Sequence, residues 1–267
     1  MFPYIYTTIV TLPLGYNTKV IIPVESLKEK ISKDYDIYDI QVKFTGFREG
    51  DIFFDEIKII DKSSQGFLEF EIEDQDKFSQ FPGYAELSFI EKNKKSIFTD
   101  RQAMSFYTAY YHKNKKSFLS DNAYKFGSPS TINQMASIKK YIDAYPTVTI
   151  DKLRDLDESL VFINPYKRKI KSYIITSDER KIENIIVNPF SAKEILLSTL
   201  LKGNETSWQG HVQLTASNRL VTFNFKHSYN NKKIISDYEH LDPFRGDPTY
   251  IPLTKFLRQK IGSLISL

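Results

Sequence analysis

The chain has 267 residues, of which 41% are hydrophobic, 26% charged and 14% aromatic, a composition typical of a folded globular protein and not of a disordered one. It has no cysteine, which excludes disulfides, thiolate zinc sites and cysteine nucleophiles. The formal net charge is +4 at pH 7, an excess too small to indicate a dedicated nucleic-acid binder.

Short strands are predicted through the first 116 residues. Runs rich in β-branched and aromatic residues, each bounded by Gly, Pro, Asp, Asn or Lys, are typical of strands. A turn signal at residues 15–17 predicts that the first two strands form a hairpin, and residues 26–32 have room for one or two helical turns. Glutamates alternate with Leu68, Phe70 and Ile72, which predicts a sheet with one wet face. The predicted strands are 7–14, 19–24, 37–44, 52–60, 67–73, 84–90 and 105–111.

The middle of the chain has a different pattern. Residues 117–129 are rich in polar and turn-forming types, and four apolar residues then follow at helical spacing: Ile132, Met135, Ile138 and Ile142. Pro146 is expected to end this helix. We therefore predict a connector over residues 117–158 that contains a helix at 130–145.

Strands return in the second half, at 160–164, 170–176, 182–187, 194–200, 211–216 and 220–227. Turn-forming residues follow Asp242, and the chain then carries an apolar stripe at helical spacing over residues 253–267. This stripe predicts a terminal amphipathic helix.

The two halves show a short internal similarity. Phe81 lies two residues before Gly83, and Trp208 lies two residues before Gly210. In each half an alternating strand, a second aromatic-rich strand, a His and an Asn-Lys cluster follow. One interpretation is a repeated closing hairpin in which Phe81 or Trp208 caps the core; chance similarity between β sequences is the alternative.

The predicted fold is mainly β, with two tandem antiparallel β-sandwich domains, Ig-like or jelly-roll-like, joined by a short helical connector. The predicted domains are residues 1–116 and 159–241. The connector 117–158 lies between them, and a tail, 242–267, carries the terminal helix.

One acidic segment offers candidate metal ligands. Asp237, Glu239, His240 and Asp242 lie close together, with Arg245 and Asp247 after them. Carboxylates beside an imidazole suit a divalent cation or a general base. The alternative is a solvated loop whose carboxylates cap turns and pair with the arginine, and we expect this, because active sites draw on distant segments. No catalytic residue, metal or cofactor is predicted.

Four groups are candidate binding residues. The N-terminal arm is unusually aromatic, and the terminal helix has an apolar face, so both are predicted to contact other subunits. A basic run at a strand end suits a polyanion, although lysines at turns are usually solvated. Trp208 caps the core or, alternatively, offers a platform for a sugar. The residues are Phe2, Tyr4 and Tyr6; Phe256, Leu257 and Ile261; Arg168, Lys169 and Lys171, in a basic run that begins at Lys167; and Trp208.

These features predict a non-enzymatic structural protein of a large assembly, a phage virion component of the head, neck, tail or decoration. It is expected to form homo-oligomers and hetero-contacts, with at most nonspecific nucleic-acid contact. The start of the sequence lacks a basic region and is interrupted by Pro3 and Pro13, so neither a classical signal peptide nor a membrane span is predicted. The alternatives are a cell-surface or carbohydrate-binding β-sandwich protein, and a metal-dependent hydrolase that uses segment 237–247; a cytoplasmic location also stays open.

Overall fold

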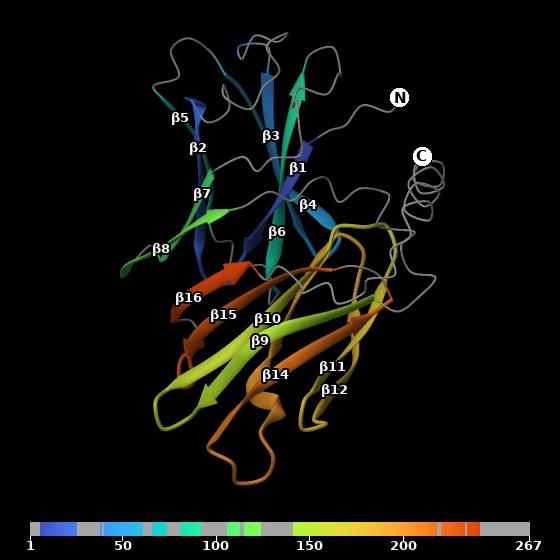
Figure 1. Cartoon of the computed structure of the whole chain (residues 1–267). Helices are drawn as coiled ribbons and strands as arrows, with labels where there is room; N and C mark the ends of the chain where they lie inside the picture. Colours follow the sequence, from blue (N-terminus) through green and yellow to red (C-terminus); the bar gives the residue numbers. More distant parts are fainter. Residues whose placement is uncertain are drawn as a thin grey trace. The chain divides into compact units, whose positions relative to one another are not determined.

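The computed structural model of the chain is mainly β-strand, arranged in several antiparallel sheets, as the sequence predicts (Figure 1). It describes residues 6–25, 38, 40–60, 66–73, 81–91, 106–112, 115–123, 141–217, 220–232 and 234–240. Within these ranges, no helix has the length and apolar character needed to cross a membrane. The chain divides into two compact units, Met1–Pro129 and Ser130–Leu267.

The first unit contains two four-stranded antiparallel sheets, with strand orders β1-β6-β3-β4 and β5-β2-β7-β8. Apolar side chains from both sheets form one cluster, in which the Phe44 and Phe70 rings lie 5.2 Å apart. The wet-face prediction for residues 67–73 is confirmed, because Leu68, Phe70 and Ile72 are buried while the alternate residues are exposed. The strands are β1 (Tyr6–Leu12), β2 (Asn17–Pro23), β3 (Ile40–Arg48), β4 (Asp51–Ile59), β5 (Phe67–Ile72), β6 (Gly83–Glu91), β7 (Phe106–His112) and β8 (Lys115–Ala123).

The hairpin predicted at residues 15–17 is wrong. β1 pairs with β6, whereas β2 pairs with β5 and β7 in the other sheet. Gly15 has a φ of 87°, and Tyr16 and Asn17 are buried, so the turn carries the chain from one sheet to the other. A turn signal predicts a chain reversal but does not say which strands pair across it.

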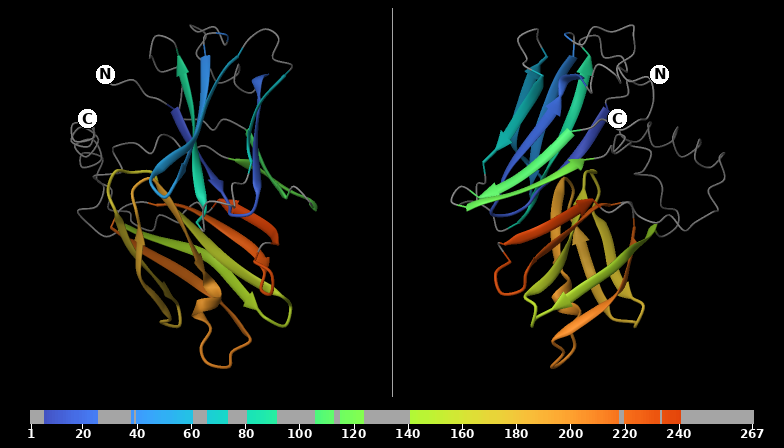
Figure 2. Two further views of the ribbon diagram at one scale, coloured as in Figure 1. Left: turned by 180° about the vertical axis from the view of Figure 1, so that it is seen from behind. Right: turned by 60° about the vertical axis from the view of Figure 1, so that its left-hand side comes forward.

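The second unit contains one eight-stranded sheet, ordered β12-β11-β14-β9-β10-β15-β16, with β13 also paired to β10. β9 and β10 are partners only at Asp151 and Leu156, so the sheet divides at this hairpin (Figure 2). Strands from both sides of the division supply one apolar cluster, which includes Ile174, Leu214 and Phe162. The elements are β9 (Tyr141–Asp151), β10 (Leu156–Asn164), β11 (Ile170–Thr176), β12 (Lys181–Val187), β13 (Ser191–Leu196), the 3₁₀ helix η2 (Leu197–Leu200), β14 (Ser207–Ala216), β15 (Val221–Ser228) and β16 (Ile235–His240).

The two units share one strand-pairing scheme. Each pairing of the first unit recurs in the second with every strand number raised by eight, and all are antiparallel. The equivalent pairs are β1·β6 and β9·β14, β3·β6 and β11·β14, β3·β4 and β11·β12, β2·β5 and β10·β13, β2·β7 and β10·β15, and β7·β8 and β15·β16. The internal similarity of the sequence falls on equivalent strands, β6 with β14 and β7 with β15, which is what a tandem repeat requires.

The predicted connector is wrong where the structure describes it. Strand β8 extends to Ala123, and strand β9 begins at Tyr141, inside the range expected to be helical. Pro146 does not end a helix: the pairing of β9 with β14 slips at this residue, with Thr147 opposite His211 and Tyr145 opposite Val212. A bulge accommodates proline in a strand because proline has no N–H to donate to the ladder. The expected helices at 26–32, 130–140 and 253–267 lie outside the described residues.

Candidate functional site

Strand β4 exposes isoleucines to solvent, although apolar residues of a strand normally face the core. Ile52, Ile57 and Ile59 are 59%, 53% and 53% exposed. Cross-strand partners share a face of a sheet, and Glu56 and Lys58 lie opposite the core residues Phe44 and Val42. Glu56 and Lys58 therefore lie on the core face of β4, while the isoleucines lie on the outer face together with Asp55, an inversion of normal patterning.

The inward charges are satisfied at the edge of the first unit. Lys58 Nζ lies 3.3 Å from a Glu56 carboxylate oxygen and 4.7 Å from the centroid of the Phe70 ring, and it donates to the Glu69 carbonyl. An inward-pointing lysine discourages further strand pairing at a sheet edge. A partner would therefore meet β4 through its side chains and not through its backbone.

Polar groups flank the exposed isoleucines. Lys43, the cross-strand partner of Ile57, places Nζ 3.1 Å from the Asp55 Oδ2, and the Thr45 hydroxyl donates to Asp55 Oδ1 at 2.7 Å. Ile52 lies opposite Phe47, on the far side of a bulge in the β3–β4 pairing. An apolar stripe with a satisfied polar border is typical of a protein contact surface. We call Ile52, Asp55, Ile57 and Ile59 the outer face of β4.

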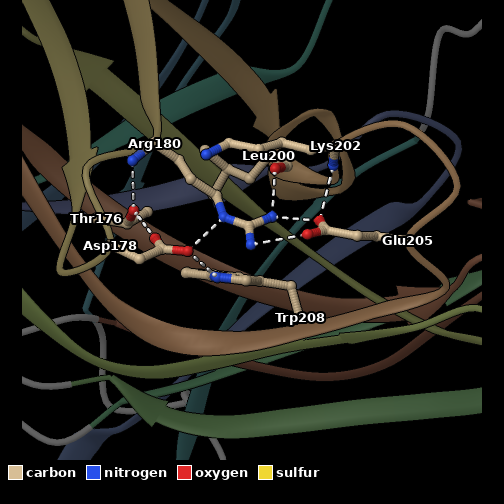
Figure 3. A network of polar contacts seen from close by, with 7 residues as sticks. All are labelled: Thr176, Asp178, Arg180, Leu200, Lys202, Glu205 and Trp208. Carbon is tan, nitrogen blue, oxygen red and sulfur yellow. Dashed lines mark hydrogen bonds and ion pairs between the residues drawn. The ribbon is translucent and has the colours of Figure 1, made fainter.

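A polar network centres on Arg180, in the β11–β12 turn (Figure 3). The Arg180 Nε lies 2.6 Å from Asp178 Oδ2, and its two terminal nitrogens lie 2.5 and 3.1 Å from the Glu205 carboxylate oxygens. One of these nitrogens also donates to the Leu200 carbonyl at 2.9 Å. The side chain is only 11% exposed. Its contacts join the β11–β12 turn to the loop before β14.

The charges of this network are fixed. The Thr176 hydroxyl, then Arg180, and then Trp208 hydrogen-bond to Asp178 and lower its carboxyl pKa well below the ordinary value. The Arg180 side chain and the Lys202 backbone N–H likewise lower the pKa of Glu205, and both carboxylates raise the pKa of Arg180. Groups held ionised near neutral pH are poor general acids or bases. The arrangement is a clamp between two loops.

Trp208 is part of the core of the second unit. Its ring is 8% exposed, its Nε1 donates to Asp178 Oδ2 at 3.2 Å, and the Arg180 guanidinium lies 5.5 Å from its centroid. A Cβ added to Gly210 would lie 2.6 Å from Trp208 Cζ2, so the Trp-x-Gly spacing makes room for the ring. Phe81, the predicted counterpart, is 48% exposed. Trp208 is therefore buried in the core of the second unit, whereas Phe81, at the corresponding position of the first unit, is about half exposed.

An open depression of about 550 Å³ adjoins the Arg180 clamp. Its lining includes Glu179, Arg180, Lys181, Glu183 and residues 199–202, so both signs of charge border it. The guanidinium, its most specific polar group, is already engaged by two carboxylates and a carbonyl. The guanidinium is thus not available to a ligand, and the remaining charged residues of the lining are Glu179, Lys181, Glu183 and Lys202.

A buried asparagine organises the basic run that the sequence singled out. Asn164, fully buried at the end of β10, donates through Nδ2 to the carbonyls of Arg168, Val187 and Asn188 at 2.8, 3.1 and 2.9 Å. Its Oδ1 accepts the Tyr166 N–H at 3.1 Å. One side chain thus ties the β10–β11 turn to the β12–β13 turn. We call Lys167, Arg168, Lys169 and Lys171, all exposed, the basic turn.

Two carboxylates near the start of β10 are structural. Asp155, in the β9–β10 turn, accepts from the Ser228 hydroxyl at 2.7 Å and from the Asn230 backbone and side-chain nitrogens at 2.8 Å. Hydrogen bonds led by the Asn230 backbone lower the pKa of Asp155. The buried Glu158 accepts from the Thr149 N–H at 2.8 Å and from Asn224 Nδ2 at 2.9 Å. Both tie neighbouring strands together.

Three of the four candidate metal ligands lie in a strand and not in the expected loop. Asp237, Glu239 and His240 belong to strand β16, and Asp237 lies 3.0 Å from Lys226 Nζ on β15. Asp237 is therefore paired with a lysine of the neighbouring strand. No group of three His, Asp or Glu residues among the described residues is placed to hold a metal. Asp242 lies outside the described residues.

Most of the predicted subunit contacts lie outside the described residues, namely Phe2, Tyr4, Phe256, Leu257 and Ile261. Tyr6 begins strand β1, where it is the partner of Phe89. The outer face of β4 and the Arg180 clamp were not predicted. The inversion of β4 depends on register, and the clamp joins residues far apart in the chain, so local patterns carry no signal for either.

Comparison with known proteins assigns no family: no family model matches the chain, and no match is found among curated proteins.

Proposed function

We propose that the protein is a non-enzymatic structural component of a large assembly, a phage virion protein, in which it binds further subunits through the outer face of β4. We also infer that each unit is a β-sandwich, an architecture that commonly presents docking surfaces. Repeated units suit such a role because they multiply similar surfaces along one chain.

The inverted pattern of β4 carries the proposal. Three isoleucines that are more than half exposed lie beside satisfied charges, while the strand's own Glu56 and Lys58 lie on the core side. Turning the isoleucines outward gives up burial that each would gain in the core, about 1.5–3 kcal/mol per side chain. A sequence that breaks the local rule usually does so at a functional surface. Contact with another subunit would bury these side chains.

The alternative functions have less support. A sugar platform needs an open aromatic face, and Trp208 is 8% exposed. A hydrolase using segment 237–247 needs converging ligands, and no group of three His, Asp or Glu residues among the described residues is placed to hold a metal.

Sedimentation velocity over a range of concentrations tests the proposal. We expect the wild-type chain to self-associate, and the double variant Ile57→Lys, Ile59→Lys to weaken this association by at least about tenfold, because two lysines would have to be desolvated. Leu153 and Ile234 are exposed aliphatic residues outside the strands of the second unit, so Leu153→Lys, Ile234→Lys is the matched control. A wild-type chain that stays monomeric at every concentration, or a control that weakens association equally, would contradict the proposal.

A further inference from the structure

The basic turn is a cluster of positive charge with no acidic partner among the described residues. Lys167, Arg168, Lys169 and Lys171 are all exposed, and within the described residues none of their side chains has an ion pair or a hydrogen bond. Four cations therefore occupy five successive positions, interrupted only by the buried Ile170. Like charges this close repel one another, and nothing in the described structure offsets the repulsion.

Several other basic side chains of the structure are compensated. Lys19 pairs with Glu69 at 2.6 Å, Lys43 with Asp55 at 3.1 Å and Lys226 with Asp237 at 3.0 Å. The Arg180 guanidinium has two carboxylate partners. The basic turn differs from these pairs because four unpaired cationic side chains occupy five successive positions.

The turn is also held in shape. Asn164, buried below it, fixes the Arg168 carbonyl and the Tyr166 N–H. Lys171 exchanges backbone hydrogen bonds with Ser217, whose hydroxyl accepts the Lys171 N–H at 3.0 Å and whose own N–H donates to the Lys171 carbonyl at 2.8 Å. A preorganised array of charges loses less entropy when it binds an anion.

From this geometry we propose that the basic turn binds the phosphate backbone of double-stranded nucleic acid without reading its sequence. Several cations close together neutralise neighbouring phosphates and release their counterions. The guanidinium of Arg168 suits bidentate phosphate contact. This activity goes beyond the proposed function and does not depend on subunit association.

The chemistry of the turn favours a duplex over other polyanions. Single-stranded nucleic acid is usually held by stacking on exposed aromatic rings, and Tyr166, the aromatic residue of the turn, is 2% exposed. A lipid surface is usually held by charge together with an apolar anchor, and the turn exposes no apolar side chain between Lys167 and Lys171. A duplex backbone requires neither feature.

Fluorescence anisotropy with a short labelled DNA duplex of mixed sequence tests the proposal. For the full-length wild-type chain, log K is expected to fall with log salt at a slope of about −3 to −4 as salt rises from about 25 to about 200 mM. The triple variant Lys167→Gln, Arg168→Gln, Lys169→Gln should bind at least about tenfold more weakly at low salt, with a slope shallower by about 2–3.

The matched control removes the same charge elsewhere. Arg154, Lys181 and Lys202 are exposed in the same unit, so their triple Gln variant also replaces one arginine and two lysines. It should retain wild-type affinity and slope. Circular dichroism and Trp208 fluorescence verify that both variants fold.

Three results would overturn the proposal. The wild-type chain fails to bind the duplex, both triple variants lose affinity equally, or vesicles containing anionic lipid are bound through the basic turn while the duplex is not. Sedimentation of the same samples reports self-association separately, so loss of duplex binding and loss of assembly are distinguishable.

Discussion

At the scale of single residues, the carboxyl of Glu86 is expected to make the stability of the first unit depend on pH. Glu86 lies on β6, where its cross-strand partners are Thr45 and Ile9. Burial raises the pKa of Glu86 from 4.5 to about 7, and the nearby Lys43 offsets only part of this rise. Lys43 also lies 3.1 Å from Asp55, so one lysine serves two carboxylates.

The raised pKa of Glu86 predicts the sign of a pH effect. Between pH 4.5 and about 7 the folded state keeps a proton that the unfolded state releases, so rising pH favours unfolding. Glu86→Gln is neutral throughout and should gain melting temperature relative to wild type as pH rises from about 5 to about 8. Calorimetric scans of both proteins across this range measure the difference. A difference that stays constant with pH would show that Glu86 ionises as in the unfolded chain.

At the scale of elements, turns in the second unit are held by single side chains that reach across to other segments. Arg180 joins the β11–β12 turn to the loop after η2, and Asp155 joins the β9–β10 turn to the β15–β16 turn. Asn164 has the most buried position of the three, and its amide serves three carbonyls.

Removing the Asn164 amide should destabilise the second unit. Asn164→Ala leaves buried carbonyls without their donors, at a cost of about 1–3 kcal/mol in the free energy of unfolding. Urea titration followed by Trp208 fluorescence measures this cost. Asn188→Ala is the matched control, because Asn188 lies in the connected turn with an exposed side chain. If both variants lower the free energy of unfolding by the same small amount, the Asn164 amide does not stabilise the second unit.

Local patterns of the sequence predicted the existence of most strands but not how they pair. The alternation in β5 and the β-branched runs of β11 and β12 identify strands without reference to partners. The segment that forms β16 was predicted to be an acidic loop. Pro146 was predicted to end a helix, because the bulge near His211 that accommodates it can be recognised only once β14 is known to be the partner of β9. The inward face of Lys58 is likewise set by the β3–β4 register.

At the scale of the whole molecule, the shared pairing scheme describes a chain with two separate cores. One apolar cluster draws its buried residues from the first unit and the other from the second. Trp208, the single tryptophan of the chain, lies in the second cluster. Its fluorescence therefore reports the second unit, whereas the backbone signal in circular dichroism reports both.

Separate cores predict separable unfolding transitions. A Cβ at Gly210 would overlap the Trp208 ring, so Gly210→Ala should destabilise the second unit by about 1–3 kcal/mol. In urea titrations we expect the Trp208 transition to move to lower urea, while the part of the circular dichroism change that comes from the first unit stays in place. A single coincident transition that shifts as a whole in the variant would show that the two units unfold as one.

The central claim is that the outer face of β4 is covered by another subunit, and cysteine labelling tests it most directly. Because the chain has no cysteine, Ile57→Cys and Leu153→Cys each introduce one exposed thiol. We predict that maleimide labelling at position 57 slows as protein concentration rises through the range of self-association, while labelling at position 153 keeps its rate. Labelling at position 57 that stays as fast in the assembled protein as in the dilute chain would contradict the account.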